Sequence, residues 1–150
     1  MPVVLFLCVG NAARSLMAEA IFNAEAPAGW HAESAGTRPA AHANPRLAAM
    51  LAEIGLSVPA HAPRAVTPEQ SRAADLRVSM GCLDDESCPA YLAMGSIRDW
   101  ALPDPARLDD AGFRRVRGEI QERVHALVRE LTADGAPGKG SSSLPEPPGR

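Results

Sequence analysis

A short loop that begins with a cysteine and ends with an arginine and a serine carries the strongest chemical signal in the sequence. It reads Cys8-Val9-Gly10-Asn11-Ala12-Ala13-Arg14-Ser15 and joins an apolar run to a helical pattern. Successive backbone N–H groups of such a loop can surround a tetrahedral oxyanion, and the N-terminus of the following helix adds positive potential. We therefore expect residues 9–14 to bind an oxyanion, with the planar Arg14 guanidinium contacting two of its oxygens.

Cys8 is the expected nucleophile of this loop. A thiol beside a helix N-terminus and a guanidinium is stabilised as the reactive thiolate, and the Ser15 hydroxyl is placed to donate a hydrogen bond to it. An isolated cysteine after an apolar run is more often a small buried residue that ends a strand. That alternative explains neither the spacing to Arg14 nor the presence of Gly10 and Asn11, two residue types that tolerate positive φ.

An aspartate between two prolines is the candidate general acid. Asp104 lies in Pro103-Asp104-Pro105, after the last expected strand, and so belongs at the same edge of the sheet as the loop. An oxygen that leaves a tetrahedral oxyanion needs a proton, which a carboxylic acid can supply. The alternative is an aspartate that only begins a turn or a helix, but its position after the last strand favours the acid.

Two further cysteines, Cys82 and Cys88, follow another expected strand in a polar, acidic stretch. The sequence holds three cysteines, and an odd number excludes a fully paired disulfide framework. In a reducing compartment such residues are more often reactive or metal-binding than structural. A zinc site needs four closely spaced ligands, and the histidines lie far from the cysteines, so we expect no metal: His31, His42, His61 and His125. Incidental thiols are the remaining alternative.

Strands and helices that alternate along the chain must position these residues. Apolar runs predict strands at residues 2–7, 31–36, 76–80 and 96–100. Helical spacing and start signals predict helices at residues 15–24, 44–55 and 109–131, where the second begins at Asn44-Pro45 and ends at Gly55. A further short helix is expected after Thr67, with Gln70 completing a capping box. Such alternation indicates a single α/β domain whose parallel sheet is covered by helices on both faces.

The composition indicates one globular domain followed by a tail. Residues 133–150 are rich in glycine, proline and serine, so we expect a disordered tail after a domain of residues 1–132. A net charge of -3 offers no basic surface for nucleic acid. The apolar run at the N-terminus is too short to span a membrane and lacks the features of a secretion signal. We expect a cytoplasmic monomer without nucleic-acid or membrane partners.

The loop, the helix start behind it and the later Asp-Pro resemble the signature of the low-molecular-weight protein tyrosine phosphatases and of the arsenate reductases that share their fold. The resemblance covers about the first 132 residues and implies a four-stranded parallel sheet flanked by helices. It assigns Cys8 as nucleophile, Arg14 as oxyanion binder and Asp104 as acid, with Asn11 shaping the loop.

The loop does not distinguish ester hydrolysis from arsenate reduction, because phosphate and arsenate share charge and shape. The phosphatases of this family place aromatic side chains after their Asp-Pro, whereas this chain has Ala106 and Arg107, and its tyrosine, Tyr91, lies elsewhere. Reduction of arsenate takes two electrons, which thiols supply by forming a disulfide. Cys82 and Cys88 therefore favour a reductase.

The resemblance to thioredoxin-coupled arsenate reductases implies a relay for arsenic detoxification. Cys82 would attack the Cys8–arsenic adduct and release arsenite, and Cys88 would then displace Cys8, which requires residues 83–87 to fold back. The expected reductant is external, either thioredoxin or a mycothiol or glutaredoxin system, and no bound cofactor is expected. Two alternatives remain: a phosphatase with a phosphocysteine intermediate, and an oxyanion-binding or redox-sensing module.

Overall fold

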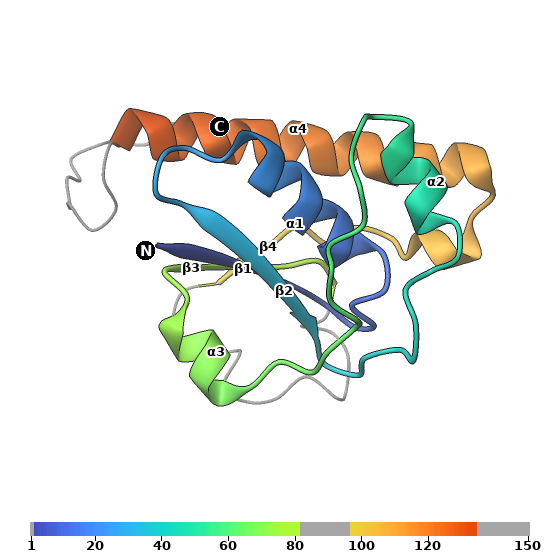
Figure 1. Cartoon of the computed structure of the whole chain (residues 1–150), viewed down its shortest axis with the longest axis horizontal. Coiled ribbons are helices and arrows are strands. Elements are labelled where there is room, and N and C mark those ends of the chain that lie inside the picture. The colour runs from blue at the N-terminus through green and yellow to red at the C-terminus, as the bar shows by residue number, and fades with distance from the viewer. Residues whose placement is uncertain (1, 82–96, 135–150) are drawn as a thin grey trace.

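The computed structural model describes residues 2–81 and 97–134 of the chain. Its strands form one sheet in the order β2-β1-β3-β4, and every neighbouring pair is parallel. In chain order the described elements are β1 (Val3–Cys8), α1 (Arg14–Glu25), β2 (His31–Gly36), α2 (Leu47–Ala52), α3 (Pro68–Ala73), β3 (Leu76–Ser79), β4 (Arg98–Asp99), the 3-10 helix η3 (Pro105–Arg107) and α4 (Asp110–Asp134) (Figure 1). The predicted α/β domain with a four-stranded parallel sheet is confirmed.

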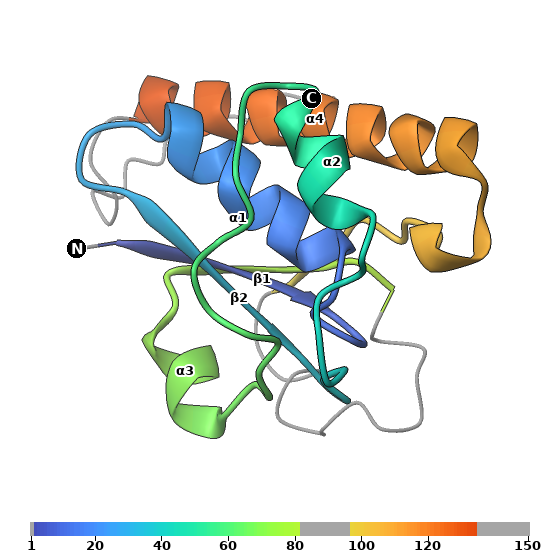
Figure 2. The ribbon, with the colours of Figure 1, turned by 45° about the vertical axis from the view of Figure 1, so that its right-hand side comes forward.

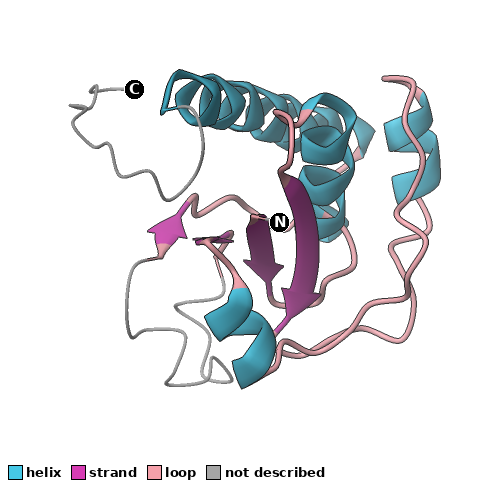
Figure 3. Cartoon of the chain, turned by 60° about the vertical axis from the view of Figure 1, so that its left-hand side comes forward, coloured by secondary structure: helices cyan, strands magenta, loops and turns pink. Residues whose placement is uncertain are grey.

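Helices cover both faces of this sheet, as predicted. α1, α2 and α4 lie on one side of it (Figure 2) and α3 lies on the other (Figure 3). The side chains of β1 alternate between the two faces: Val4, Phe6 and Cys8 belong to the core under α1 and α4, whereas Leu5 and Leu7 belong to a smaller core on the opposite face. Because β1 is buried on both faces, its sequence is a continuous apolar run.

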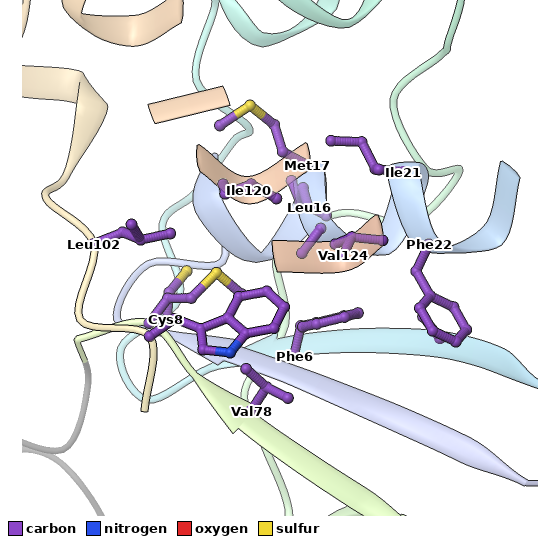
Figure 4. Packing of buried hydrophobic residues seen from close by; sticks show 14 of the residues in the cluster. Phe6, Cys8, Leu16, Met17, Ile21, Phe22, Val78, Leu102, Ile120 and Val124 are labelled. Atoms are coloured by element: carbon purple, nitrogen blue, oxygen red, sulfur yellow. The ribbon is translucent and has the colours of Figure 1, made fainter. Parts of the chain in front are cut away.

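The larger core fixes Cys8 relative to α1. The predicted apolar face of α4 is confirmed, since each of its members is at most 8% exposed: Phe113, Val116, Ile120, Val124, Leu127 and Leu131. On β1, Phe6 contacts the ring of Phe22 from α1 at 6.1 Å between centroids and that of Trp100 at 5.7 Å. Cys8, the last residue of β1, belongs to the same core cluster and is 1% exposed (Figure 4).

The second helix begins later than its sequence predicts. α2 starts at Leu47, because the Asn44 side chain accepts a hydrogen bond from the Arg46 N–H at 2.8 Å and forms a turn before the helix. The helix ends at Ala52, and the chain then turns as far as Gly55, where φ is +80°. The sequence predicts that the helix ends at Gly55. The structure places this glycine in the turn that follows the helix.

The start of α3 follows the prediction only in part. Thr67 caps the helix, with its side-chain oxygen 3.0 Å from the Gln70 N–H. The Gln70 side chain does not complete a capping box, because its amide donates instead to Glu33 on β2 at 3.2 Å. Tertiary contact with the sheet thus replaces the local interaction.

The remaining boundaries differ at the ends of the elements. The expected strand at 76–80 ends at Ser79, and the last strand is only Arg98–Asp99, with residue 96 outside the described residues. α4 ends at Asp134, so the boundary that we expect between domain and tail, after residue 132, falls inside this helix. An existing helix can extend by backbone hydrogen bonds alone, without burying further side chains. Residues 133 and 134 are helical, and 135–150 lie outside the described part. No described helix is long and apolar enough to cross a membrane.

Gly36 at the end of β2 lets the backbone of residues 8–15 pass close to the sheet. A Cβ at this position would lie 2.5 Å from the Val9 carbonyl oxygen and 3.0 Å from the Asn11 nitrogen. Gly36→Ala should therefore lower the free energy of unfolding by about 1–3 kcal/mol, as overpacking does, in urea denaturation. The control is Gly118→Ala in α4, where a Cβ meets nothing within 4 Å and stability should rise by roughly 0.5–1 kcal/mol. Equal effects of the two substitutions would contradict this prediction.

Candidate active site

The oxyanion loop, residues 8–15, is held from one side by the backbone of residues 37–44. Four loop carbonyls accept hydrogen bonds from N–H groups of this segment, at 2.8–3.2 Å: Cys8 from Thr37, Val9 from Arg38, Gly10 from Ala40 and Ala12 from Asn44. A trans peptide places its N–H opposite its carbonyl. The N–H groups of residues 9, 10, 11 and 13 therefore point away from residues 37–44, and none of them has an acceptor within the described residues.

This arrangement gives the loop the form of an anion nest. Unpaired backbone N–H groups from consecutive residues supply partial positive charge to the same side of the loop. α1 begins at Arg14, directly after the loop, and contributes the positive end of its dipole. The N–H groups of residues 9, 10, 11 and 13 are thus placed to meet an anion, while oxyanion binding by residues 9–14 stays a prediction.

Asn11 gives the loop its shape. Its φ is +49°, a left-handed conformation that asparagine adopts more readily than most residues, and it is fully buried. The side-chain oxygen accepts from the Arg64 N–H at 3.0 Å, and the side-chain nitrogen donates to the hydroxyls of Ser15 at 2.8 Å and Ser34 at 3.0 Å. These hydrogen bonds offset a backbone strain of roughly 1–3 kcal/mol.

Ser15 lies against the sulfur of Cys8. The two side-chain atoms are 3.0 Å apart, and both residues are buried. Because the Ser15 oxygen already accepts a hydrogen from Asn11, its own hydrogen is available to the sulfur when Cys8 is a thiolate. The structure thus brings Cys8 and Ser15 together as the sequence predicts.

Arg14 connects the oxyanion loop to the ends of two other segments. Its Nη1 donates to the carbonyl of Met80, directly after β3, at 2.7 Å and to that of Leu102 at 3.0 Å. Nε and Nη2 make no hydrogen bond to the described residues. One edge of the guanidinium is therefore anchored, and the other edge remains for two oxygens of an anion. A Cβ at Gly81 would lie 3.0 Å from Nη1, so this glycine leaves room for the arginine.

The turn after β4 is shaped by a carboxylate that the sequence does not single out. Asp99 accepts hydrogen bonds from the Ala101 N–H at 3.0 Å and from the Ser79 hydroxyl at 3.1 Å. Ala101 consequently adopts a φ of +42°, unusual for alanine. The turn directs the carbonyl of Leu102 to Arg14.

Asp104 follows this turn and is exposed to solvent. Its Oδ1 accepts a hydrogen bond from the Ala106 N–H at 3.0 Å, and Pro105 begins η3. Asp104 therefore begins a helical turn and also lies in the segment that Leu102 ties to Arg14. The two readings that the sequence leaves open are compatible, and the role as acid stays a prediction.

A chain of buried hydrogen bonds extends from Asn11 behind the loop. The Ser34 hydroxyl, which accepts from Asn11, donates to Glu19 at 2.6 Å, and His61 Nε2 lies 2.8 Å from the same carboxylate oxygen. The hydrogen bonds of this chain are not predicted from local sequence, because its members come from three distant segments. The available signal was Glu19, a carboxylate within the apolar start of α1, which is only 7% exposed.

Cys82, Cys88 and Tyr91 lie outside the described residues, as does the segment 83–87 that was expected to fold back. The chain enters that segment at Gly81, beside Arg14. Within residues 2–81 and 97–134 no group of three or more histidine, cysteine, aspartate or glutamate side chains could hold a metal ion. The zinc alternative, which involves the two cysteines, is therefore untested.

The parallel sheet, the cysteine at the end of the inner strand β1 and the arginine at the start of the next helix define a class of small α/β proteins with a Cys-x5-Arg oxyanion loop. Residues 3–136 match the model of the family described as low molecular weight phosphotyrosine protein phosphatase. The chain belongs to this family.

Relatives include both reductases and a phosphatase. A putative arsenate reductase of Halobacterium salinarum is 31% identical over 138 residues, 86% of this chain and 92% of that protein. The structure of a thioredoxin-dependent arsenate reductase of Corynebacterium glutamicum superposes with a TM-score of 0.73 at 31% identity, over 89% of this chain but only 63% of the other. A low-molecular-weight tyrosine phosphatase of T. tengcongensis has a TM-score of 0.70 at 26% identity, over 87% of this chain and all of the other.

Asn11 can be tested by comparing two substitutions. Asn11→Ala removes all three side-chain hydrogen bonds and keeps a Cβ at positive φ, whereas Asn11→Gly removes the same bonds and relieves the backbone strain. Both variants should be less stable than the native chain in urea denaturation, and the alanine variant should be the worse by about 1 kcal/mol. An alanine variant as stable as the native chain would show that Asn11 does not shape the loop.

Proposed function

We propose that this protein reduces arsenate to arsenite, with Cys8 as the nucleophile in the oxyanion loop. The observation that carries the proposal is a loop that begins with Cys8, in which four backbone N–H groups and one edge of the Arg14 guanidinium have no partner among the described residues. The relatives named as arsenate reductases support the choice of arsenate over other tetrahedral oxyanions.

The first step is a substitution at arsenic. The Cys8 thiolate, which accepts a hydrogen bond from Ser15, attacks the bound arsenate and forms a sulfur–arsenic bond. One arsenic–oxygen bond breaks, and the leaving hydroxide takes a proton from Asp104 and departs as water. The loop N–H groups and Arg14 stabilise the negative charge that the oxyanion carries in the transition state. Arsenic remains As(V) in this step.

Reduction follows when Cys82 attacks the Cys8 sulfur. A disulfide forms between Cys8 and Cys82, the electron pair of the sulfur–arsenic bond passes to arsenic, and As(III) leaves as arsenite. Cys88 then attacks the Cys82 sulfur and releases the Cys8 thiolate. An external thiol system reduces the Cys82–Cys88 disulfide by exchange. Thioredoxin is the proposed reductant, with mycothiol or glutaredoxin systems as alternatives, and the role is arsenic detoxification by a cytoplasmic monomer.

Hydrolysis of phosphate esters is the second candidate, supported by the family and by the phosphatase relative. Hydrolysis would use the same three residues, Cys8 as nucleophile, Arg14 as anion binder and Asp104 as acid, and would pass through a phosphocysteine intermediate. The composition of η3 argues against an aryl phosphate as substrate, because the residues that follow Asp104 there, the exposed Ala106 and Arg107, are not aromatic. Trp100, just before the turn, packs in the core and is 8% exposed. Neither η3 nor the buried Trp100 therefore offers an aromatic ring for a substrate to stack on.

One coupled assay separates these functions. The chain is supplied with arsenate, thioredoxin, thioredoxin reductase and NADPH, and NADPH oxidation is followed. The native chain should turn over, Cys8→Ser should be inactive, and Cys82→Ser and Cys88→Ser should each lose turnover because a relay step is missing. The same four chains are tested for hydrolysis of an aryl phosphate, which requires Cys8 but neither Cys82 nor Cys88.

Three outcomes would contradict the proposal in whole or in part. Turnover that survives both relay substitutions would exclude the relay while leaving arsenate reduction in place. Aryl phosphate hydrolysis without arsenate-dependent NADPH oxidation would establish the phosphatase. Arsenate binding without either activity would leave only an oxyanion-binding module.

A further inference from the structure

Arg46, between residues 37–44 and α2, contacts the segment that carries Asp104. Its Nη2 donates to the carbonyl of Pro105 at 3.1 Å, with Ala106 O at 3.5 Å, and its Nη1 donates to Asp110 at the start of α4 at 3.0 Å. The guanidinium also lies over the ring of Phe113, 4.9 Å from its centroid. Arg46 thereby joins α2, η3 and α4 at one point.

The Pro105–Ala106 peptide connects this arginine to the carboxylate of Asp104. The carbonyl of the peptide accepts from Arg46, and the N–H of the same peptide donates to Asp104 Oδ1 at 3.0 Å. These two hydrogen bonds fix the orientation of the planar Pro105–Ala106 peptide. The positive charge of Arg46 on the carbonyl side also polarises this peptide, which makes its N–H a stronger donor to Asp104. The position of the Asp104 carboxylate thus depends on Arg46.

The same arginine is tied to the oxyanion loop on its other side. The Arg46 N–H donates to the Asn44 side chain at 2.8 Å, and the Asn44 N–H donates to the carbonyl of Ala12 at 2.9 Å. A short series of hydrogen bonds therefore runs from the loop through Asn44 and Arg46 to the peptide beside Asp104. This connection and the Arg14 bonds described above link the segment that carries Cys8 to the segment that carries Asp104.

We propose that Arg46 is a positioning residue for the general acid, an inference that rests on the proposed role of Asp104. Arg46 touches no reacting atom. It holds the Pro105–Ala106 peptide so that the carboxyl of Asp104 meets the leaving oxygen. An arginine serves this position better than a lysine, because the two ends of its guanidinium fork reach two acceptors in different directions, Asp110 and Pro105, whereas a lysine ammonium reproduces this only in part.

The test is a double-substitution cycle in single turnover. Reduced chain in excess over arsenate is quenched at intervals and arsenite is measured, for the native chain, Arg46→Ala, Asp104→Asn and the pair. Arg46→Ala should slow arsenite formation by about tenfold, since small misplacements of catalytic groups cost that much or more, with arsenate affinity nearly unchanged. In the Asp104→Asn background it should cause no further decrease. Arg46→Lys should recover part of the rate.

Arg114→Ala is the matched control. Arg114 binds Glu53, after α2, at 2.9 and 3.0 Å and leaves η3 untouched. Hydrogen bonds from Arg114 and Arg117 lower the pKa of Glu53 to about 2, so this ion pair is intact at any working pH. The control should leave the rate unchanged, and thermal unfolding of each variant separates a folding defect from a positioning defect.

A second readout does not depend on activity. Hydrogen exchange of the Ala106 amide, followed by NMR, should accelerate in Arg46→Ala and stay unchanged in Arg114→Ala. Additive losses in the cycle, or an Ala106 amide that exchanges as before, would overturn the role of Arg46. A native chain that makes no arsenite would refute the proposed function instead, and the cycle would then be run on aryl phosphate hydrolysis, where the same interpretation applies.

Discussion

The hydrogen bonds between the loop carbonyls and the backbone of residues 37–44 are the constraint on which the site depends. They turn four carbonyls outward, and planar trans peptides then leave four N–H groups on the opposite side. No side chain of the loop need be polar for this purpose, which is why Val9, Ala12 and Ala13 can occupy it. Gly36 at the end of β2 permits the close approach, and the core around Phe6 fixes the strand that delivers Cys8.

Two buried polar residues, Asn11 and Arg14, complete the proposed site around this backbone arrangement. Asn11 holds the left-handed position and donates to Ser15, which leaves the Ser15 hydrogen for the Cys8 sulfur. Arg14 uses one end of its guanidinium to connect the segments after β3 and β4, so that the oxyanion site and the Asp104 segment are assembled together. The positions of Cys8, of the proposed anion site and of Asp104 are therefore coupled through backbone carbonyls.

Much of the fold and the site could be predicted from local sequence, because local chemistry determines them. The apolar run of β1, the 31–36 strand, the face of α4 and the residue pattern of the Cys8–Ser15 loop can each be recognised from residues close in the chain. Features that depend on distant partners could not be predicted: Gln70 donates to Glu33 and not to its own helix start, and Asn44 is drawn to Ala12 and delays α2. The roles of Asp99, Glu19 and Arg46 likewise arise only when separate segments meet.

We expect the backbone of the oxyanion loop to bind a tetrahedral anion with N–H groups that are already in place. The most direct measurement is an NMR titration of the reduced native chain with inorganic phosphate, which resembles arsenate but leaves the cysteines unoxidised. The amide protons of Val9, Gly10, Asn11 and Ala13 should shift downfield together, with one saturating affinity, while residues 37–44 keep their hydrogen bonds to the loop. Saturable binding that leaves these four amides unmoved would contradict the account.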